Sequence, residues 1–440
     1  MQRRQFLGDL AALSLGVACQ AIPRHAQPAT RPQEHILVIG AGMAGLAAAE
    51  RLSRAGRSVT VLESRSRIGG RIWTSRIWPD APVDMGASWI HGIRGNPLTT
   101  LANRVGARHI VTDYDNAITY DAAGRVAGQA FERYLDDTLA TAIDRAIARA
   151  RASGRDSSLG SVLGKQFNAN TLTPRQLAAY HFYVNSTFEH EYAGDIDAMS
   201  VLSFDDSDDY GGDDVLFPDG YDALPNALAR GLDVRFNHPV TGIAYHGKGV
   251  VVSTLSGDFA ADRVLITVPL GVLKSDTLSF SPALPAAKRQ AIRLLGMGVL
   301  NKTWLRFPFA FWPRQYDWLE YVPAEKGRWC EWIGGFERYA GSPLLLGFNA
   351  ARFGRDIEDW PDQDIVDSAM QTLRTLYGQD IPNPDAWQIT RWAKDPYALG
   401  AYSYYGTGSH RRHRIDLARP VLNRLFFAGE ATSPDSPATV

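Results

Sequence analysis

The fold of this chain is decided by the stretch His35-Ile-Leu-Val-Ile-Gly-Ala-Gly-Met-Ala-Gly45. The apolar run over 36–39 predicts a buried parallel strand that leads directly into Gly40, Gly42 and Gly45. This glycine spacing is typical of a dinucleotide-binding turn. It permits a tight turn, a close approach of the backbone to a pyrophosphate, and close packing of the helix on the strand. The stretch therefore predicts a nucleotide site.

The residues after this turn complete a strand–helix–strand unit. Leu46, Ala49 and Leu52 give the expected helix its apolar side, and the apolar run over 59–62 predicts the next strand. Glu63 stands at the end of that strand, about 20 residues beyond the glycines, where a carboxylate accepts hydrogen bonds from a ribose diol. Because strand, glycines, helix, strand and acid occur in register, the prediction is more specific than the glycines alone would make it.

A second glycine turn directly follows Glu63. The run Ser64-Arg-Ser-Arg-Ile-Gly-Gly-Arg71 adds two glycines and ends in an arginine. A second backbone turn with a guanidinium can reach the same pyrophosphate from the other side, because arginine donates two parallel hydrogen bonds to a phosphate. We therefore expect Gly70 and Arg71 to bind the nucleotide, and the earlier arginines of this run to lie on a surface loop.

This region resembles the FAD-dependent amine oxidase family, whose pattern V-x-E-x-x-x-R-x-G-G-R is matched by residues 61–71. The segment Asp84-Met-Gly-Ala-Ser-Trp-Ile-His-Gly92 is similar to the flavin-facing segment of the polyamine-oxidase branch of that family. The resemblance implies that His91 contacts an inner nitrogen of a polyamine. It also implies cofactor contacts from Gly86, Ala87, Ser88 and Trp89.

The resemblance further implies an α/β fold with two domains, the flavin amine oxidase fold. A Rossmann-type FAD-binding domain would be assembled from residues 31–98, 206–275 and 386–440. An α+β substrate-binding domain would be assembled from residues 99–205 and 276–385. The FAD-binding domain is thus expected to be discontinuous in sequence, with the substrate-binding domain inserted into it.

Periodic patterns predict individual elements between the motifs. Apolar residues at three- and four-residue spacing predict an amphipathic helix over 131–150, and Thr173 is a capping residue for a helix that runs to about residue 184. The apolar run over 263–269 predicts a buried parallel strand. In the resembling family, the backbone at the position of Val240 meets the adenine.

Lys302 falls within an otherwise alternating strand and matches the N-K motif of the resembling family. In that family the lysine holds a water against the reactive nitrogen of the flavin. The alternative is a surface lysine on an edge strand. Five tryptophans between residues 304 and 332 are expected mostly in the core, and some could line an apolar pocket.

The last third of the chain matches two further motifs of the family. Trp392 opens a loop that would bring Tyr402 before the flavin, where its side chain orients the amine nitrogen. Family members with a covalently attached flavin carry cysteine immediately before this tyrosine, and this chain has Ala401, so we expect non-covalent FAD. Gly429 and Glu430 match the closing FAD motif, in which the acid binds the ribitol-phosphate region.

Near Val440 the sequence departs from the family pattern, which continues into a helix whose N-terminus faces the flavin pyrimidine. We therefore expect a chain that is truncated or that lacks this helix. Thr439 occupies the second position of the aromatic pair found in monoamine oxidases. The resulting wide slot beside Tyr402 favours polyamine-type substrates.

The composition describes an ordinary globular protein, with 45% hydrophobic residues and a formal net charge of −1, and gives no indication of nucleic acid as a partner. Residues 1–30 are interpreted as a twin-arginine signal peptide, with Arg3-Arg4 before an apolar segment too short to span a bilayer. We expect the twin-arginine export machinery as a partner, a periplasmic mature protein and no stable membrane insertion. Cys19 leaves with the signal, Cys330 then has no disulfide partner, and no His/Cys cluster has metal-ligand spacing.

Negative charge is concentrated over 189–192 and 205–214. These residues form either solvated loops or an acidic mouth that attracts a cationic substrate. Glu189 or Glu191 could bind a distal ammonium, and the sequence does not choose between them.

The resemblance implies oxidation of a primary or secondary amine, with polyamine-like amines favoured. The imine product would be hydrolysed to an aldehyde and an amine, and O2 would be reduced to H2O2. The alternatives are an L-amino-acid oxidase of the same fold, a desaturase or porphyrinogen oxidase, and a flavin-binding scaffold without turnover.

Overall fold

The computed structural model describes residues 34–247 and 249–440, and residues 34–440 form one compact unit. The predicted signal peptide lies outside the described residues. In the described part of the chain, no helix combines the length and the apolar character needed to cross a bilayer.

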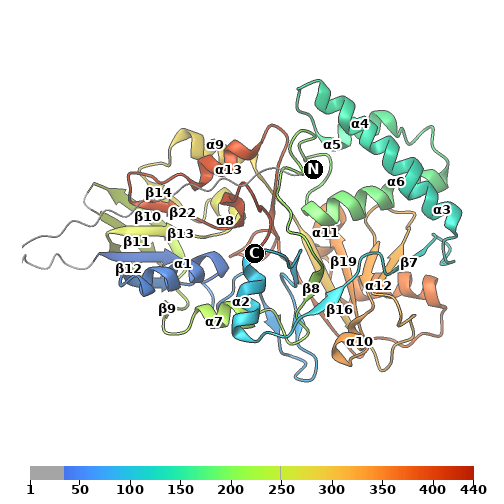
Figure 1. The fold of residues 1–440 in the computed structure, drawn as a ribbon, viewed down its shortest axis with the longest axis horizontal. Coiled ribbons are helices and arrows are strands. Elements are labelled where there is room, and N and C mark those ends of the chain that lie inside the picture. The colour runs from blue at the N-terminus through green and yellow to red at the C-terminus, as the bar shows by residue number, and fades with distance from the viewer. Residues whose placement is uncertain (1–33, 248) are drawn as a thin grey trace, which may run out of the picture. The chain divides into compact units, whose positions relative to one another are not determined.

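The part of the molecule that carries the predicted nucleotide site, called the nucleotide end, is built on a five-stranded parallel sheet (Figure 1). The strand order is β22-β13-β1-β2-β9. Its strands are β1 (His35–Ile39), β2 (Ser58–Leu62), β9 (Asp233–Arg235), β13 (Arg263–Ile266) and β22 (Leu425–Phe427). Helix α1 (Met43–Arg54) follows the first glycine turn. The predicted parallel strands are confirmed, and segments far apart in the sequence supply them, which confirms the α/β class.

The parallel sheet is covered on both faces by apolar contacts. On one face, Val38 of β1 packs with Leu46 and Ala49 of α1. On the other face, Leu37 and Ile39 join a cluster with a four-stranded sheet of order β12-β11-β10-β14. The strands of that second sheet are β10 (Val240–His246), β11 (Gly249–Thr254), β12 (Gly257–Ala261) and β14 (Ser279–Ser281).

The part that carries most of the predicted substrate-binding segments, called the substrate end, is built on a six-stranded sheet. The strand order is β20-β16-β19-β18-β17-β7. Its strands are β7 (Ala117–Tyr120), β16 (Leu300–Arg306), β17 (Trp318–Tyr321), β18 (Glu331–Ile333), β19 (Leu344–Ala350) and β20 (Ala386–Ile389). One face packs against α12 (Asp362–Tyr377), where Leu305, Trp332 and Leu345 join Leu373 in one cluster. The other face therefore remains for side chains of the site.

A helical segment follows β7 and contains two π-helical stretches. Helix α3 (Gln129–Arg133) continues through the π-helix η1 (Tyr134–Leu139) into α4 (Ala140–Ala152). The helix predicted over 131–150 is thus helical throughout, but six of its residues adopt π geometry. Helix α5 (Leu159–Gln166) is followed by α6 (Pro174–Val184), whose predicted cap at Thr173 is confirmed as a capping box, and α6 runs into the π-helix η2 (Asn185–His190).

Smaller elements connect these parts. Three small sheets pair β5 (Trp89–Ile90) with β8 (Asp214–Leu216) and β6 (Ile110–Thr112), β3 (Thr74–Ser75) with β4 (Val83–Asp84), and β15 (Gly296–Met297) with β21 (Ser403–Tyr404). The remaining helices are α2 (Pro97–Val105), α7 (Ala223–Leu228), α8 (Leu270–Lys274), α9 (Ala286–Leu294), α10 (Phe336–Ala340), α11 (Ala351–Asp356), the 3-10 turns η3 (Ile357–Asp359) and η4 (Glu430–Thr432), and α13 (Arg411–Ala418).

The predicted domain boundaries stay a prediction. Strand β20, expected within the FAD-binding segment 386–440, pairs instead with β16 of the six-stranded sheet.

Candidate active site

The two predicted glycine turns lie against each other. Gly40 adopts φ +101°, and a Cβ at Gly45 would lie 2.0 Å from the Gly40 carbonyl oxygen, so both positions require glycine. A Cβ at Gly70 would lie 3.4 Å from Gly42 Cα, which places the second turn directly beside the first. At Gly42 itself, a Cβ would meet no protein atom within 4 Å. The backbone is therefore open where a pyrophosphate is expected to approach.

Glu63 lies beside the first turn, as predicted. Its buried carboxylate accepts hydrogen bonds from the backbone N–H of Ala41 at 2.7 Å and of Arg65 at 2.9 Å. Each carboxylate oxygen has a second lone pair that can accept a ribose hydroxyl. The Glu63 carbonyl accepts from His238 N–H at 2.9 Å, so the segment that leads to Val240 lies next to this end of the site.

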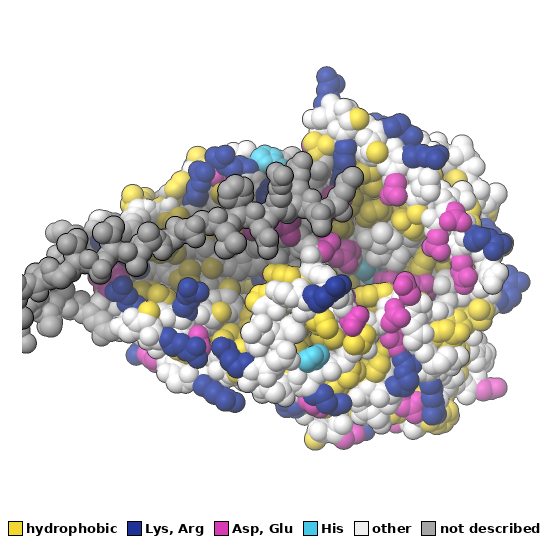
Figure 2. All heavy atoms as spheres, viewed as in Figure 1, with side chains coloured by type: hydrophobic (Ala, Val, Ile, Leu, Met, Phe, Trp, Pro, Cys, Tyr) yellow, Lys and Arg dark blue, Asp and Glu magenta, His cyan; other side chains and the backbone are white. Residues whose placement is uncertain are grey.

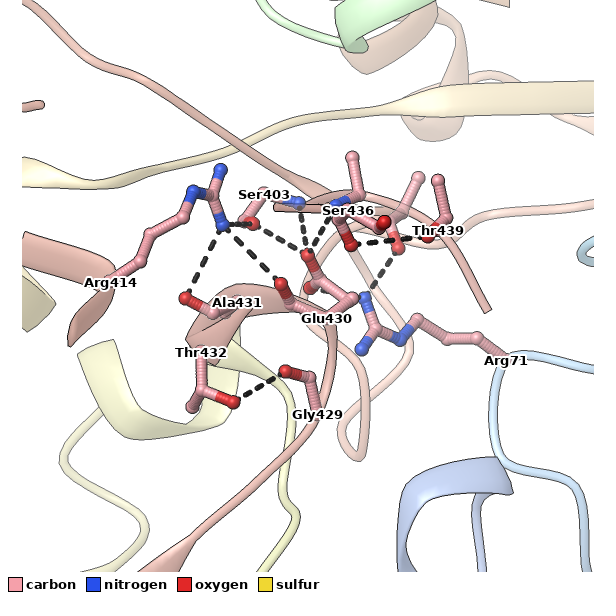
Figure 3. Close-up of polar contacts among 11 residues, drawn as sticks. Arg71, Ser403, Arg414, Gly429, Glu430, Ala431, Thr432, Ser436 and Thr439 are labelled. Atoms are coloured by element: carbon pink, nitrogen blue, oxygen red, sulfur yellow. Dashed lines mark hydrogen bonds and ion pairs between the residues drawn. The ribbon is translucent and has the colours of Figure 1, made fainter. Parts of the chain in front are cut away.

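Arg71 and Glu430 meet in one buried network (Figure 3). Arg71 Nη1 donates to Glu430 Oε1 at 2.9 Å and to the Ala401 carbonyl at 2.8 Å. Ser403 Oγ donates to the other carboxylate oxygen of Glu430 at 2.5 Å. Burial alone would raise the pKa of Glu430, but Arg71 and Arg414 hold it below its ordinary value. Glu430 is therefore an anion that joins the closing motif to the second glycine turn.

Arg414 of α13 is a member of this network that the sequence analysis did not find. It is 1% exposed, and its Nη1 donates to Ser403 Oγ at 2.7 Å and to the Ala431 carbonyl at 3.3 Å (Figure 3). Its guanidinium lies 4.4 Å from the centre of the Tyr405 ring. A signal did exist in the sequence, because Arg414 and the buried Leu417 are three residues apart and share one helix face.

These residues fit FAD. A groove runs along the carboxyl ends of the parallel strands, where open α/β sheets bind nucleotides, and its lining includes Arg71, Thr267, Gly429 and Glu430. The two glycine turns offer backbone N–H groups, and Arg71 offers a cation to the phosphates. With Gly40, Gly42, Gly45, Glu63 and Gly70, they form the set of residues that would hold the cofactor.

Lys302 contacts the predicted flavin-facing segment, residues 84–92. Its Nζ donates to the carbonyls of Asp84 at 3.0 Å and Gly86 at 2.6 Å and to Ser88 Oγ at 2.5 Å. Burial lowers the pKa of Lys302, and the neighbouring Asp84 carboxylate partly offsets this. The ammonium therefore uses its three N–H groups to shape this segment, and its predicted contact with a water stays a prediction.

Gly86 and Ala87 are fixed by Arg71. A Cβ at Gly86 would lie 1.7 Å from the Arg71 carbonyl oxygen, and Ala87 N–H donates to the same oxygen at 3.2 Å. Trp392 closes this contact, because its Nε1 donates to the Met85 carbonyl at 3.2 Å. The structure thus brings together the flavin-facing segment, the second glycine turn and the first residues of the Tyr402 loop.

Asn301, the partner of Lys302 in the N-K motif, positions the loop that carries Tyr402. Its Oδ1 accepts from Trp392 N–H at 3.1 Å, and its Nδ2 donates to Glu358 Oε1 at 2.7 Å. Glu358 accepts in turn from the backbone N–H groups of Ala393 at 2.9 Å and Lys394 at 3.0 Å. One buried asparagine therefore fixes the start of the loop relative to Lys302.

Tyr402 and Thr439 lie close to Glu430. Glu430 Oε2 is 3.3 Å from the backbone N–H of both Ser403 and Ala438, the neighbours of these two residues in the chain. Thr439 is exposed, and its hydroxyl donates to the Ser436 carbonyl at 3.2 Å (Figure 3). The backbone segments of the predicted pair therefore meet at Glu430, and the pairing of the two side chains stays a prediction.

The hydroxyl of Tyr402 is engaged by the helical segment. It donates to the backbone carbonyl of His190, the last residue of η2, at 2.5 Å. Burial raises the pKa of Tyr402 well above its ordinary value, and Glu191, Tyr114 and Glu331 raise it further. Tyr402 is therefore a neutral hydrogen-bonding group in an acidic environment.

Aromatic side chains extend from Lys302 toward solvent. The Trp89 ring stacks on Trp318 at 6.1 Å and on His91 at 6.2 Å, and it lies 6.3 Å from Phe348. Tyr114 stacks on Trp318 at 4.8 Å. These rings form an apolar wall suited to an alkyl chain, and cations bind to such ring faces.

His91 lies at the exposed rim of this wall rather than inside it. Its Nδ1 is 2.7 Å from Asp214 Oδ2. The His91 side chain is 57% exposed, so the desolvation by its neighbours that lowers its pKa is outweighed by the hydrogen bond to Asp214 and the charges of Glu191 and Asp209, which raise it. The pKa of the Glu191 carboxyl is also raised, here by the desolvation that its neighbours cause. The Glu191 side chain still contacts solvent.

Only part of the acidic sequence contributes to the rim. Glu189 is buried, and its carboxylate accepts from Lys326 Nζ at 2.7 Å and from Asn185 Nδ2 at 2.9 Å, so it is not a candidate for substrate binding. Two further residues of the acidic run are paired with arginines, Asp205 with Arg151 and Asp206 with Arg411. On the face shown in Figure 2, acidic side chains gather near the middle, between hydrophobic patches.

The comparisons with known proteins agree with this geometry. The chain is 34% identical to polyamine oxidase 4 of Oryza sativa subsp. japonica, a match that covers 92% of this chain and 85% of that protein. It is also 34% identical to lysine-specific histone demethylase 1 homolog 1 of the same plant over 99% of this chain, which spans only 54% of that protein. A solved structure of putrescine oxidase bound to putrescine superposes with a TM-score of 0.74 at 19% identity, covering 92% of this chain and 95% of that one, and shows the fold.

The family model for flavin-containing amine oxidoreductases matches residues 43–440, nearly the whole described chain. The fold, the cofactor and the class of reaction predicted from the sequence are thereby confirmed. This chain belongs to the flavin-containing amine oxidoreductase family and is a flavin-dependent enzyme with FAD as its cofactor.

Proposed function

We propose that this enzyme oxidises aliphatic diamines or polyamines at a C–N bond. The observation that carries the proposal is the environment of Tyr402. Among the described residues, the ionisable groups that raise its pKa are two carboxylic acids, Glu191 and Glu331, and one phenol, Tyr114. Aromatic rings and carboxylates together bind organic cations. The polyamine oxidases and the putrescine oxidase among the similar proteins act on this class of substrate by name.

The residues of the chain bind and orient the amine. The rings of Trp89, Trp318 and Phe348 exclude water from the alkyl chain, and the carboxylates at the rim raise the local concentration of a cation. Lys302 holds the flavin-facing segment in place, and the lone pairs of Tyr402 Oη remain free to accept from an amine N–H. When bound, FAD supplies the two-electron oxidation of the C–N bond, and the oxidised amine is hydrolysed to an aldehyde.

An L-amino-acid oxidase is disfavoured by the same observation. Its substrate carries a carboxylate, which needs a cationic clamp near the reacting nitrogen. At Tyr402 the nearby charged groups are instead carboxylates, which repel a second carboxylate and attract a second ammonium.

The proposal is tested by mixing the FAD-loaded enzyme without oxygen with spermine, spermidine, putrescine, tyramine and lysine, and following the visible flavin band. We expect bleaching by the first three amines at micromolar to millimolar concentrations. Bleaching by lysine or tyramine alone would overturn the substrate assignment. Admission of O2 afterwards, with a peroxide assay, tests the proposed formation of H2O2.

Lys302→Met separates a chemical role of Lys302 from a purely structural one. We expect the rate of flavin bleaching to fall by roughly 10²-fold, the size of a lost acid–base contribution. FAD affinity and the melting temperature report separately on the carbonyls of Asp84 and Gly86 that lose their donor. If the rate falls only in proportion to the FAD that is lost, the chemical role is wrong.

A further inference from the structure

A buried lysine lies beside the wall of the cofactor groove. Lys288 belongs to α9, and its side chain is only 2% exposed. Helix α9 packs against α13, although 128 residues separate Lys288 from Asp416 in the chain (Figure 1). Removing an ammonium from water is costly unless it is paired with acceptors, so its position behind the groove calls for a role.

The Lys288 ammonium binds the carboxyl end of α13. Its Nζ donates to the Leu417 carbonyl and, at 3.2 Å, to the Asp416 carbonyl. Both carbonyls belong to the last turn of α13, whose carbonyls have no partner inside the helix. The negative end of the helix dipole also favours a cation at this place. The ammonium therefore fixes the position at which α13 ends.

The same ammonium lies over the face of an aromatic ring. Its Nζ is 3.9 Å from the centre of the Phe427 ring, which is within the range of a cation–π contact. Phe427 is the last residue of β22, and both Phe427 and Leu417 line the cofactor groove. Lys288 thus holds two residues of the groove wall, one by its backbone and one by its side chain.

Helix α13 connects Lys288 to the network around Glu430 as well. Arg414 lies three residues before Leu417 in this helix, and its Nη1 donates to the Ala431 carbonyl at 3.3 Å. Apolar contacts join the same parts, because Ala291 of α9 shares one buried cluster with Leu417 and Ala431. A shift of the end of α13 would therefore move the Arg414 guanidinium together with the groove wall.

We propose that Lys288 is a positioning residue for FAD. Its ammonium sets the place of the two wall residues and of the helix that carries Arg414, so that the groove keeps the shape of the cofactor. It also adds one positive charge beside a groove that receives an anionic pyrophosphate. This role goes beyond the choice of amine, because it concerns how the cofactor is held.

The charge of Lys288 depends on pH. Burial lowers its pKa from 10.5 to about 8, while Asp416 raises it and Arg419 lowers it. The Asp416 carboxylate forms ion pairs with Arg412 and Arg419, which limits its attraction for Lys288. From β22, Lys288 faces the uncharged ring of Phe427. A neutral amine loses the cation–π contact, so the hold on the wall should weaken above about pH 8.

The test measures the release of FAD from the loaded enzyme on dilution, followed by the rise of flavin fluorescence. In Lys288→Met two buried carbonyls lose their charged donor, and we expect the Kd for FAD to rise by about tenfold or more at pH 7. The ratio of the two Kd values, variant over parent, should stay constant below about pH 8 and decrease above it. Groups that titrate in both proteins, such as Lys302, cancel in this ratio.

Lys274→Met is the matched control. Lys274 Nζ donates in the same manner to three carbonyls at the end of α9, those of Ile292, Arg293 and Leu295 at 2.7, 2.9 and 2.8 Å. None of the described residues of α9 lines the groove. The control should therefore lower the melting temperature as Lys288→Met does and leave the Kd for FAD within about twofold of the parent.

Lys288→Gln is the second variant, because a glutamine amide can donate to the carbonyls of α13 but carries no charge. We expect its Kd for FAD to lie between those of the parent and Lys288→Met. A Kd that rises in the Lys288 variants alone, with a ratio that decreases above about pH 8, would support the proposal. Parent-like Kd values in both Lys288 variants would overturn it. An equal rise in Lys274→Met and Lys288→Met would overturn it too, because FAD binding would then follow general stability.

Discussion

The nucleotide end and the substrate end of this molecule face their ligands with different parts of the chain. At the nucleotide end the glycine turns 40–45 and 69–70 offer backbone, and they lie within one short stretch of sequence. At the substrate end a row across the six-stranded sheet offers side chains, one from each of five strands. Its members are Lys302, Phe348, Glu331, Glu320 and Thr119. A ligand site made of backbone loses its ligand when a side-chain atom is added, because the backbone must then move away. In a ligand site made of side chains, each replacement changes the affinity or the specificity.

The largest effects are therefore expected from single carbon atoms at the nucleotide end. In Gly45→Ala the new Cβ would meet the Gly40 carbonyl oxygen at 2.0 Å, and the helix must shift away from the turn. We expect a loss of about 3 kcal/mol or more in the free energy of unfolding and loss of FAD binding. Urea unfolding of the FAD-free protein and fluorescence titration with FAD measure the two effects.

Gly42→Ala is the matched variant for this experiment, because its Cβ meets no protein atom. The FAD-free protein should stay within about 1 kcal/mol of the parent, as expected for alanine at an N-cap position. FAD affinity should nevertheless fall by about tenfold or more, because the methyl group occupies the space of the pyrophosphate. Parent-like FAD affinity in Gly42→Ala would show that the cofactor does not approach this turn.

Arg414 tests whether the nucleotide end also depends on side chains. Arg414→Met removes the donor to Ser403 and Ala431 and leaves Arg71 as the remaining cation at Glu430. We expect a loss of about 1–3 kcal/mol in stability and FAD binding weakened several-fold. Arg412→Met in the same helix is the control, since it breaks only an exposed ion pair with Asp416 and should change stability by less than about 1 kcal/mol.

If Arg414→Met and Arg412→Met shift the melting temperature and the FAD titration equally, the buried network does not position the closing motif. A loss of stability without a change in FAD affinity would confine Arg414 to the packing of α13.

The same difference explains how far the sequence could be interpreted. The glycine turns, Glu63 and the run from Glu63 to Arg71 were predictable because neighbours in the sequence remain neighbours in the turn. Asn301 and Lys302 were found through a short motif, although the hydrogen bonds that Asn301 makes to residues 358 and 392 were not. Nothing local in the sequence places Glu331 beside His190.

Two physical reasons account for what was missed. The register between strands is set by packing over long sequence separations, so local patterns do not show that Glu331 pairs with Glu320 and Phe348. The π-helix η2 is only six residues long, too short to show a period of its own, so no local pattern indicates that it directs His190 toward the sheet. Arg414 was missed because the sequence analysis assigned no helix to 411–418, and because charged side chains are mostly exposed.

At the substrate end, no loss of stability is expected, and the last prediction concerns the pH dependence that Glu320 causes. Burial raises its pKa from 4.5 to about 7, although Thr119 donates to it at 2.6 Å. Between pH 4.5 and pH 7 the folded protein therefore binds more protons than the unfolded chain, so the free energy of unfolding decreases as pH rises through this window. Glu320→Gln removes this decrease and should gain on the order of 2 kcal/mol relative to the parent between pH 5 and pH 8. The control is Glu325→Gln, because the Glu325 carboxylate is exposed. If the free energy of unfolding of Glu320→Gln and of the parent changes with pH in the same way, the pKa of Glu320 is not raised by burial.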